Sequence, residues 1–202
     1  NGAGLQFDDD CQVTVLTDGP INGYEGCATV SDALTGDYLF CTNSAQVWDR
    51  NGQLMNGSPL VPNGNTITQV TIVQKPGSDR LYYIFTSEVQ AFSGQGYRFH
   101  AVDMSLNGGA GGLVFTDSVL YPTPVTEKLT AIRHANGTDV WLLGHEYGSD
   151  AYLAFLVTSA GNSRLPLISP PFSISRPSRP RSRRPAVTPP PANGTPLPST
   201  VW

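Results

Sequence analysis

The sequence has few of the residues with which proteins usually crosslink a fold or bind a metal ion. Three cysteines and three histidines among 202 residues give neither a disulfide framework nor a Cys-x-x-Cys pair of the kind that holds zinc. Charged residues make up only 14% of the chain. No apolar run reaches the roughly 18 residues that a membrane-spanning helix needs. The sequence therefore predicts no cofactor and no transmembrane segment.

Acidic residues are absent from the last part of the chain. All 16 of them lie at or before Asp150, whereas six of the 12 basic residues are arginines that follow Asn162. Six basic against 16 acidic residues give residues 1–161 a formal charge of −10, and six arginines give residues 162–202 a charge of +6. Because phosphate binding requires a concentrated basic surface, we expect no nucleic-acid partner.

The most informative feature that is present is a fifteen-residue pattern that occurs three times without a gap. The copies are ATVSDALTGDYLFCT (28–42), IVQKPGSDRLYYIFT (72–86) and AIRHANGTDVWLLGH (131–145). Each runs from a short semi-apolar stretch through a turn rich in glycine, asparagine, aspartate, serine or proline into an apolar strand. The eleventh position is aromatic in every copy: Tyr38, Tyr82 and Trp141. Copies that start 44 and 59 residues apart are typical of a blade-type β architecture.

Each copy predicts the first two strands of an antiparallel unit. The predicted units lie near residues 28–57, 72–121 and 131–161, and their central, most buried strands are residues 37–41, 81–86 and 140–144. Further strands are predicted at residues 5–7, 12–16, 45–49, 53–55, 97–102, 113–115, 119–121 and 152–157. The fold class is therefore all-β: a partial β-propeller of about three four-stranded antiparallel blades over residues 1–161, with almost no helix. The three aromatic residues should occupy equivalent places, and the open arc should expose sheet edges.

The composition changes after Gly161. Residues 166–202 contain 11 of the 17 prolines, and PSRPRSRRP (177–185) mixes proline, serine and arginine with no acidic residue. Such a segment buries too little apolar surface to offset its ordering entropy, so residues 162–202 are predicted to form a disordered tail. A charged linker, a ligand for a proline-binding domain, a nucleic-acid arm and a shifted reading frame all fit this composition.

Three local features suggest chemistry but lack the pattern that the chemistry requires. The DDDC run (8–11) lacks the spaced oxygen ligands of a calcium loop and favours a solvated turn. The NGGAGG stretch (107–112) matches no nucleotide-binding loop and opens no helix, which favours a hairpin loop. Cys27 and Cys41 flank a predicted hairpin, where they could lie side by side as free thiols in the core, the interpretation that we favour, or as a disulfide.

The candidate ligand-binding residues are polar side chains in or next to the repeats. They are Glu25, Glu127, Lys128, His134 and His145. His134 and His145 are expected nearly opposite each other in the third copy, either on a polar rim or as half of a metal site. Glu25 and Glu127 precede the first and third copies, and a hydrolase would need such a carboxylate pair across a cleft. No nucleophile, base and acid occur in a recognisable arrangement, so no catalytic residue is predicted.

Several segments follow, in order, the pattern of a known group of proteins. They are NGAGLQF (1–7), LTDG (16–19), EGCATVSD (25–32), VWDRNGQLM (47–55), KPGSDRLYYIFT (75–86), VDMSLNGG (102–109) and PVTEKLTAIRHANGTDVWLLGH (124–145). With these segments, residues 1–161 resemble the amino-terminal propeller-like region of large surface proteins from gliding bacteria with type IX secretion. Those proteins typically continue into PKD-like immunoglobulin-type domains and end in a gliding-motility-associated sorting domain. Residues 162–202 depart from the pattern, and the aromatic-glycine segment that usually precedes the NGAGL-like start is missing.

The resemblance implies a secreted, cell-surface protein, of which this chain is a piece that continues into further blades and downstream domains. It brings no catalytic residues with it. We therefore expect a non-enzymatic scaffold or adhesion module, associated with gliding motility or surface attachment, that binds a glycan or protein partner. The alternative is a glycan-active hydrolase on a propeller scaffold. Two carboxylates facing each other across a cleft would favour the hydrolase, and an exposed aromatic cluster would favour binding.

Overall fold

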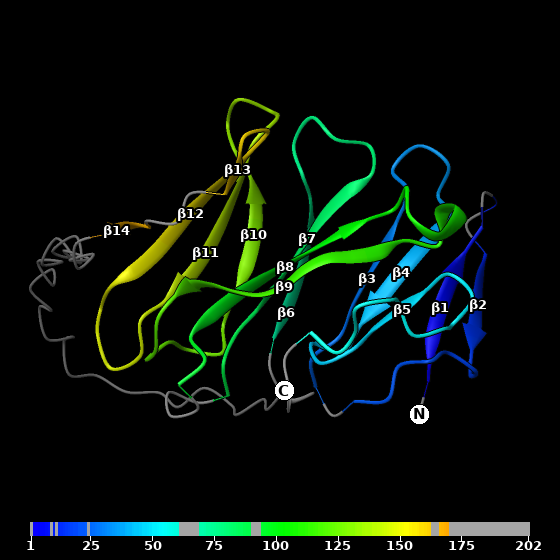
Figure 1. Cartoon of the computed structure of the whole chain (residues 1–202), viewed down its shortest axis with the longest axis horizontal. Coiled ribbons are helices and arrows are strands. Elements are labelled where there is room, and N and C mark those ends of the chain that lie inside the picture. The colour runs from blue at the N-terminus through cyan, green and yellow to red at the C-terminus, as the bar shows by residue number, and fades with distance from the viewer. Residues whose placement is uncertain are drawn as a thin grey trace, which may run out of the picture. The chain divides into compact units, whose positions relative to one another are not determined.

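Four antiparallel β-sheets make up the part of the chain that the structure, a computed structural model, describes (Figure 1). That part comprises residues 2–8, 10, 12–23, 25–60, 69–89, 94–162 and 166–169. It belongs to the first of the two units into which the chain divides, residues 1–172 and residues 173–202. The single helical element within the described ranges is a 3₁₀ turn, η1, at Asn107–Gly109. None of the described helical residues belongs to a helix long and apolar enough to cross a membrane.

The smallest of these sheets is a two-stranded N-terminal hairpin of β1 (Gly4–Phe7) and β2 (Val13–Leu16), where the sequence predicts two strands. The three larger sheets are numbered first to third in chain order. Its cross-strand pairs place four apolar side chains on one face: Leu5 opposite Val15, and Phe7 opposite Val13. All four are more than half exposed. The ends of the hairpin are joined by a hydrogen bond that Gly19 N–H donates to Gly2 O at 2.9 Å.

The first sheet contains β3 (Ala28–Ser31), β4 (Tyr38–Thr42) and β5 (Val47–Asp49). β3 and β4 pair around a loop in which Asp32 Oδ1 accepts two hydrogen bonds from backbone N–H groups. The fourth strand predicted at residues 53–55 is reduced to an isolated bridge between Trp48 and Leu54. The hairpin of the first copy is therefore confirmed, but the sheet has three strands instead of four.

The second sheet is a four-stranded meander of β6 (Val70–Gln74), β7 (Leu81–Thr86), β8 (Tyr97–Asp103) and β9 (Gly112–Tyr121). β9 is continuous where the sequence predicts two strands, residues 113–115 and 119–121. Asp117 lies between them at a φ of 61°, which bends β9 without ending it.

The third sheet contains β10 (Thr130–Arg133), β11 (Val140–His145), β12 (Tyr152–Thr158), β13 (Gly161–Asn162) and β14 (Leu167–Ser169). β14 pairs with β12, although it lies in the segment for which the sequence predicts disorder. Strands are therefore described beyond Gly161, at Gly161–Asn162 and Leu167–Ser169. The predictions for residues 170–202, including the linker and the shifted reading frame, fall outside the described residues.

Two hydrophobic cores join these three sheets face to face in chain order. On β7, Tyr82 and Ile84 belong to the core against the first sheet, and Tyr83 and Phe85 belong to the core against the third. Burial on both faces explains why β7 is apolar throughout its length. β4, β7 and β11 each lie between two other strands, as predicted, and β6 contacts both β3 and β10. An all-β fold is thus confirmed, and none of the described sheets closes on itself.

The prediction that Tyr38, Tyr82 and Trp141 occupy equivalent places is wrong. Tyr82 is buried in the core between the first and second sheets, where its ring meets Phe40 edge to face at 5.7 Å. Trp141 is half-buried and belongs to neither core, and Tyr38 is exposed. The three aromatic residues therefore have different surroundings.

Hairpin register explains why Tyr82 and Trp141 lie on different faces of their sheets. In the second copy, Lys75 N–H donates to Leu81 O, and the loop encloses residues 76–80. In the third copy, His134 N–H donates to Asp139 O, and the loop is one residue shorter. Because side chains alternate across a strand, a shift of one residue moves every later side chain to the opposite face.

Candidate functional site

An apolar and aromatic surface covers the side of the third sheet that faces away from the second sheet. The side of the third sheet that faces the second sheet carries Leu142, Leu153 and Phe155, which belong to the core between the two sheets. Because side chains alternate across a strand, their neighbours point the other way. We call this surface the outer face; it includes Ile132, His134, Trp141, Leu143, His145, Tyr152, Ala154, Leu156 and Leu167.

Cross-strand pairing arranges the outer face in adjacent rows. Ile132 lies opposite Trp141, and Leu143 lies opposite Ala154, which pairs in turn with Leu167. Ile132 is 56% exposed and Leu167 is 66% exposed. Contiguous exposed apolar side chains on a soluble surface are typical of sites that bind other molecules.

His134 and Trp141 lie in contact at the loop end of the outer face, with ring centroids 5.4 Å apart. His134 Nδ1 accepts a hydrogen bond from Asn136 N–H at 3.0 Å, which orients the imidazole. Asn136 Oδ1 in turn accepts hydrogen bonds from the N–H groups of Thr138 and Asp139, both at 3.0 Å. The loop thus holds the His134 ring against the indole of Trp141.

His145 and Tyr152 lie in contact at the other end, with ring centroids 4.7 Å apart in an edge-to-face arrangement. Tyr97 supports this end from the second sheet. Its buried hydroxyl accepts a hydrogen bond from His145 N–H at 3.0 Å. The same hydroxyl lies 3.0 Å from Thr126 O, 3.1 Å from Lys128 O and 3.2 Å from His145 O, any one of which can accept its one proton. Burial raises the pKa of Tyr97, so this proton is retained.

Gly144 makes room for the Tyr97 ring. A Cβ added at Gly144 would lie 2.7 Å from Tyr97 Cζ and 2.8 Å from its hydroxyl oxygen. Real Cβ atoms essentially never approach other atoms so closely, so this position in β11 requires a glycine. Through this close approach, Tyr97 of the second sheet packs against Gly144 of the third sheet, next to His145.

Two of the five predicted site residues, His134 and His145, lie on the outer face. A third, Lys128, is exposed in the segment before β10, where its backbone O lies 3.1 Å from the Tyr97 hydroxyl. The prediction that the two histidines lie nearly opposite each other is wrong. His134 closes the hairpin loop with Asp139, so the loop is centred between Asn136 and Gly137. The two histidines consequently occupy opposite ends of the outer face, where they cannot form half of one metal site.

The two predicted carboxylates belong to different parts of the stack. Glu127 is half-buried in the segment before β10, and its backbone carbonyl accepts a hydrogen bond from the Ser87 hydroxyl at 3.1 Å. Glu25 is exposed in the segment before β3. These segments enter the first and third sheets, which pack on opposite sides of the second.

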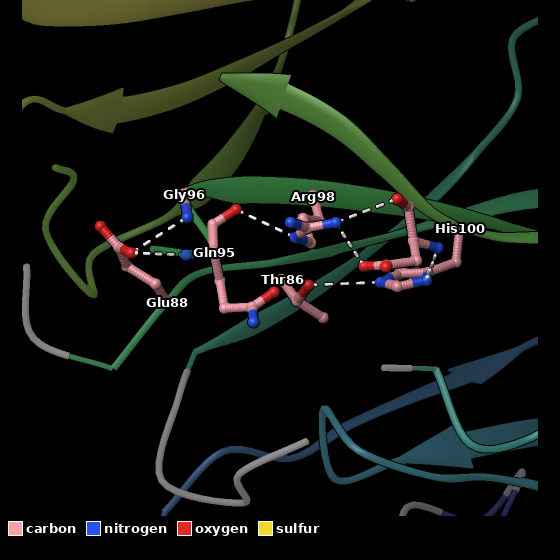
Figure 2. Close-up of polar contacts among 7 residues, drawn as sticks. Thr86, Glu88, Gln95, Gly96, Arg98 and His100 are labelled. Atoms are coloured by element: carbon pink, nitrogen blue, oxygen red, sulfur yellow. Dashed lines mark hydrogen bonds and ion pairs between the residues drawn. The ribbon is translucent and has the colours of Figure 1, made fainter. Parts of the chain in front are cut away.

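A buried carboxylate that the sequence analysis did not single out lies at the end of β7 (Figure 2). Glu88 is 1% exposed. Its Oε2 accepts hydrogen bonds from Gln95 N–H and Gly96 N–H, both at 3.0 Å. Its Oε1 accepts hydrogen bonds from Val125 N–H and the Thr123 hydroxyl, both at 2.8 Å. Burial by itself would raise the pKa of Glu88, but the hydrogen bonds outweigh burial and lower it. Glu88 thus ties the end of β7 to two loops.

A histidine and an ion pair continue this polar arrangement along β8 (Figure 2). Arg98 Nη1 lies 2.6 Å from Asp117 Oδ1, and Arg98 Nε donates to Gln95 O at 2.9 Å. The fully buried His100 accepts a hydrogen bond at Nδ1 from Asp117 N–H at 2.9 Å. Its proton therefore lies on Nε2, which faces Thr86 Oγ1 at 3.3 Å. These contacts position the bend in β9.

The three features of uncertain chemistry have structural roles in the described residues. Asp8 Oδ1 accepts two backbone hydrogen bonds, as in a turn, and Asn107 Nδ2 donates to Gly111 O in the loop between β8 and β9. Cys41 is a buried free thiol whose pKa burial raises, as the favoured interpretation predicts. Cys27 is also a free thiol but is exposed, so the prediction that it lies in the core is wrong. Cys41 pairs with Thr29, so Cys27 is not directly opposite it. Within the described ranges, no three histidine, cysteine or acidic side chains cluster closely enough to hold a metal ion.

The chain was compared with family models, curated proteins and solved structures. No family model, no curated protein and no solved structure matches the chain.

Proposed function

We propose that this protein is a non-enzymatic scaffold or adhesion module that binds its partner through the outer face of the third sheet. The observation that carries the proposal is the cluster of exposed Ile132, Leu143 and Tyr152 with the half-buried Trp141 on adjacent strands. Aromatic side chains provide a large contact area and lose little conformational freedom on binding. They lie on a sheet whose opposite side is hydrogen-bonded to Tyr97 of the second sheet, so the surface is preorganised for binding.

The charge of the protein narrows the class of ligand. The outer face contains no carboxylate. The 16 acidic residues of the chain all precede residue 151 and give this part of the protein a negative charge that repels anionic polymers. A neutral glycan or an apolar protein surface therefore fits the outer face better than a nucleic acid does.

The resemblance and the stacking of the sheets support a proposal for the location and the larger architecture. β3, β6 and β10 are the first strands of their sheets, and β6 adjoins both of the others, as the inner strands of neighbouring propeller blades do. We infer that the three larger sheets form an arc of a propeller. The resemblance to surface proteins of gliding bacteria supports secretion and a role in surface attachment or gliding motility.

A glycan-active hydrolase on the same scaffold is the second candidate. Glycosidases use two carboxyl groups about 5–9.5 Å apart across a cleft. Glu25 and Glu127 belong to segments that enter different sheets, and the Glu88 carboxylate is occupied by four hydrogen-bond donors. This arrangement favours binding over hydrolysis.

Glycan and protein arrays probed with the full chain, together with a hydrolysis assay on the same glycans, test the proposal. Trp141→Ala should weaken binding about tenfold, because one aromatic contact contributes about 0.5–1.5 kcal/mol beyond its buried area. Leu34→Ala is the control, since Leu34 is 96% exposed on a loop of the first sheet. Binding that Trp141→Ala leaves unchanged contradicts the outer face as the site. Turnover that disappears in Glu25→Gln or Glu127→Gln contradicts the absence of catalysis.

A further inference from the structure

Two apolar β faces are exposed on opposite sides of the stack of sheets. One is the outer face of the third sheet. The other is the face of the N-terminal hairpin that carries Leu5, Phe7, Val13 and Val15, with exposed fractions between 51% and 69%. The segment after this hairpin lies on the first sheet, where Asn43 Nδ2 donates a hydrogen bond to Asn22 O at 2.9 Å. The second sheet separates the first sheet from the third, so the two faces lie at opposite ends of the stack (Figure 1).

The N-terminal hairpin has a particular need for a covering surface. An isolated two-stranded hairpin is marginally stable in water, because it has no second layer against which to bury its apolar side chains. In this hairpin, both cross-strand apolar pairs point into solvent. A sheet packed on that face would supply the missing layer.

We propose that a second copy of this chain covers the outer face of the third sheet with its N-terminal hairpin. This inference rests on the proposed function, because it assigns a partner to the same face. The chain already stacks its sheets in one direction, each sheet packing on the next. Head-to-tail association continues that order and covers both exposed faces with one kind of contact. Pairing two third sheets with each other would leave both hairpins exposed.

The two faces are compatible in size and chemistry. β1 and β2 pair over four residues, about 13 Å, and β11 and β12 pair over six residues, about 20 Å, so the hairpin fits within the sheet. Neither face carries a carboxylate, a lysine or an arginine. The four side chains of the hairpin face bury less area than a standard protein interface does, which predicts weak association that depends on concentration. A head-to-tail contact closes a ring if the rotation between copies permits and otherwise continues as a series.

Sedimentation velocity of the full chain over a concentration series tests this contact. The wild-type protein should pass from 21.6 kDa toward twice that mass or more as concentration rises. Two double variants each alter one face: Phe7→Thr with Val15→Thr on the hairpin, and Ile132→Thr with Leu143→Thr on the third sheet. Threonine suits exposed strand positions because it keeps the β-branched shape. Each double variant alone should remain monomeric.

A matched control replaces exposed valines elsewhere. Val114→Thr with Val119→Thr changes two β9 residues that are 49% and 50% exposed, and this variant should associate as the wild type does. Circular dichroism verifies that each variant keeps its β-structure. If a double variant unfolds, the single variants Phe7→Thr and Ile132→Thr replace it.

An equimolar mixture of the two double variants decides the orientation. In the head-to-tail arrangement, the intact hairpin of one variant meets the intact third sheet of the other, so the mixture regains association that neither variant shows alone. A hairpin variant that associates by itself overturns the proposal, because the third sheets would then pair with each other. A wild-type chain that stays monomeric at every concentration also overturns it. In that case, binding of a glycan or another protein that depends on Trp141 leaves the proposed function standing.

Discussion

Replacing the buried His100 should remove much of the acid sensitivity of this fold between pH 7 and pH 5. His100 lies on β8 with no exposed surface, accepts a hydrogen bond from Asp117 N–H and faces the Thr86 hydroxyl. Burial, with a smaller contribution from the positive charge of Arg98, lowers its pKa from 6.5 to about 3. The folded protein therefore keeps this imidazole neutral at a pH at which an exposed histidine is protonated.

The sign and size of the effect follow from proton linkage. An unfolded chain takes up a proton at this residue as pH falls below about 6.5, and the folded chain does so only near pH 3. The stability that neutral His100 contributes is fully present above pH 6.5 and is lost progressively as pH falls toward 3. At pH 5, about 1.5 units below the unfolded pKa, the loss is about 2 kcal/mol at 1.36 kcal/mol per unit. This value holds for any folded pKa well below 5.

Urea unfolding of the wild type and of His100→Asn at pH 7 and pH 5 measures the effect. The asparagine Oδ1 can accept the Asp117 N–H hydrogen bond in place of Nδ1, and asparagine does not titrate. The wild type should lose about 2 kcal/mol more than the variant between the two pH values. Equal losses in both proteins, at equal dependence on urea, would refute the reasoning.

Two further substitutions test how the second sheet holds its neighbours. Gly144→Ala should lower the free energy of unfolding by about 1–3 kcal/mol, because the added methyl group overlaps the Tyr97 ring. Gly4→Ala is its control, since the nearest atom to the added methyl lies at 3.7 Å, and an equal effect of both would contradict the close approach. Glu88→Gln should cost about 2–4 kcal/mol, because the amide nitrogen leaves two backbone or hydroxyl donors without an acceptor. The exposed Glu25→Gln should stay within about 0.5 kcal/mol, and chemical denaturation compares the two.

The strands and hairpins of this fold could be predicted from the sequence because their signals are local. The turn residues between two apolar runs indicate each hairpin, and the apolar length of β7 reflects burial on both of its faces. Asp32 shows the same principle, since its carboxylate accepts hydrogen bonds from the loop that it precedes. The central positions of β4, β7 and β11 followed from these signals.

Register and face could not be predicted in the same way. A gapless alignment assumes loops of equal length, but the loop that His134 closes is one residue shorter than the loop that Lys75 closes. That residue decides whether Trp141 faces a core or solvent, and hence whether the third sheet has an aromatic outer face. The histidine pair was misplaced for the same reason, because the position opposite a residue depends on the centre of the loop.

The polar arrangement around Glu88 and His100 depends on contacts between distant parts of the chain. Glu88 accepts a hydrogen bond from Val125, 37 residues away, and Asp117 donates to His100 across the bend in β9. The sequence does contain a local signal, because Glu88 is a single carboxylate just after the apolar strand β7. Its role could be recognised only when the loops that supply its donors were placed.

Hydroxyl-radical footprinting of the full chain shows whether the outer face of the third sheet is a binding surface. The rate of side-chain oxidation is measured with and without the bound partner, or at low and high protein concentration. Oxidation of Trp141 and Tyr152 should slow when the outer face is covered, while oxidation of Leu34 on the first sheet should be unchanged. Unchanged oxidation of Trp141 and Tyr152 under conditions in which binding or association is measured would contradict the outer face as a binding surface.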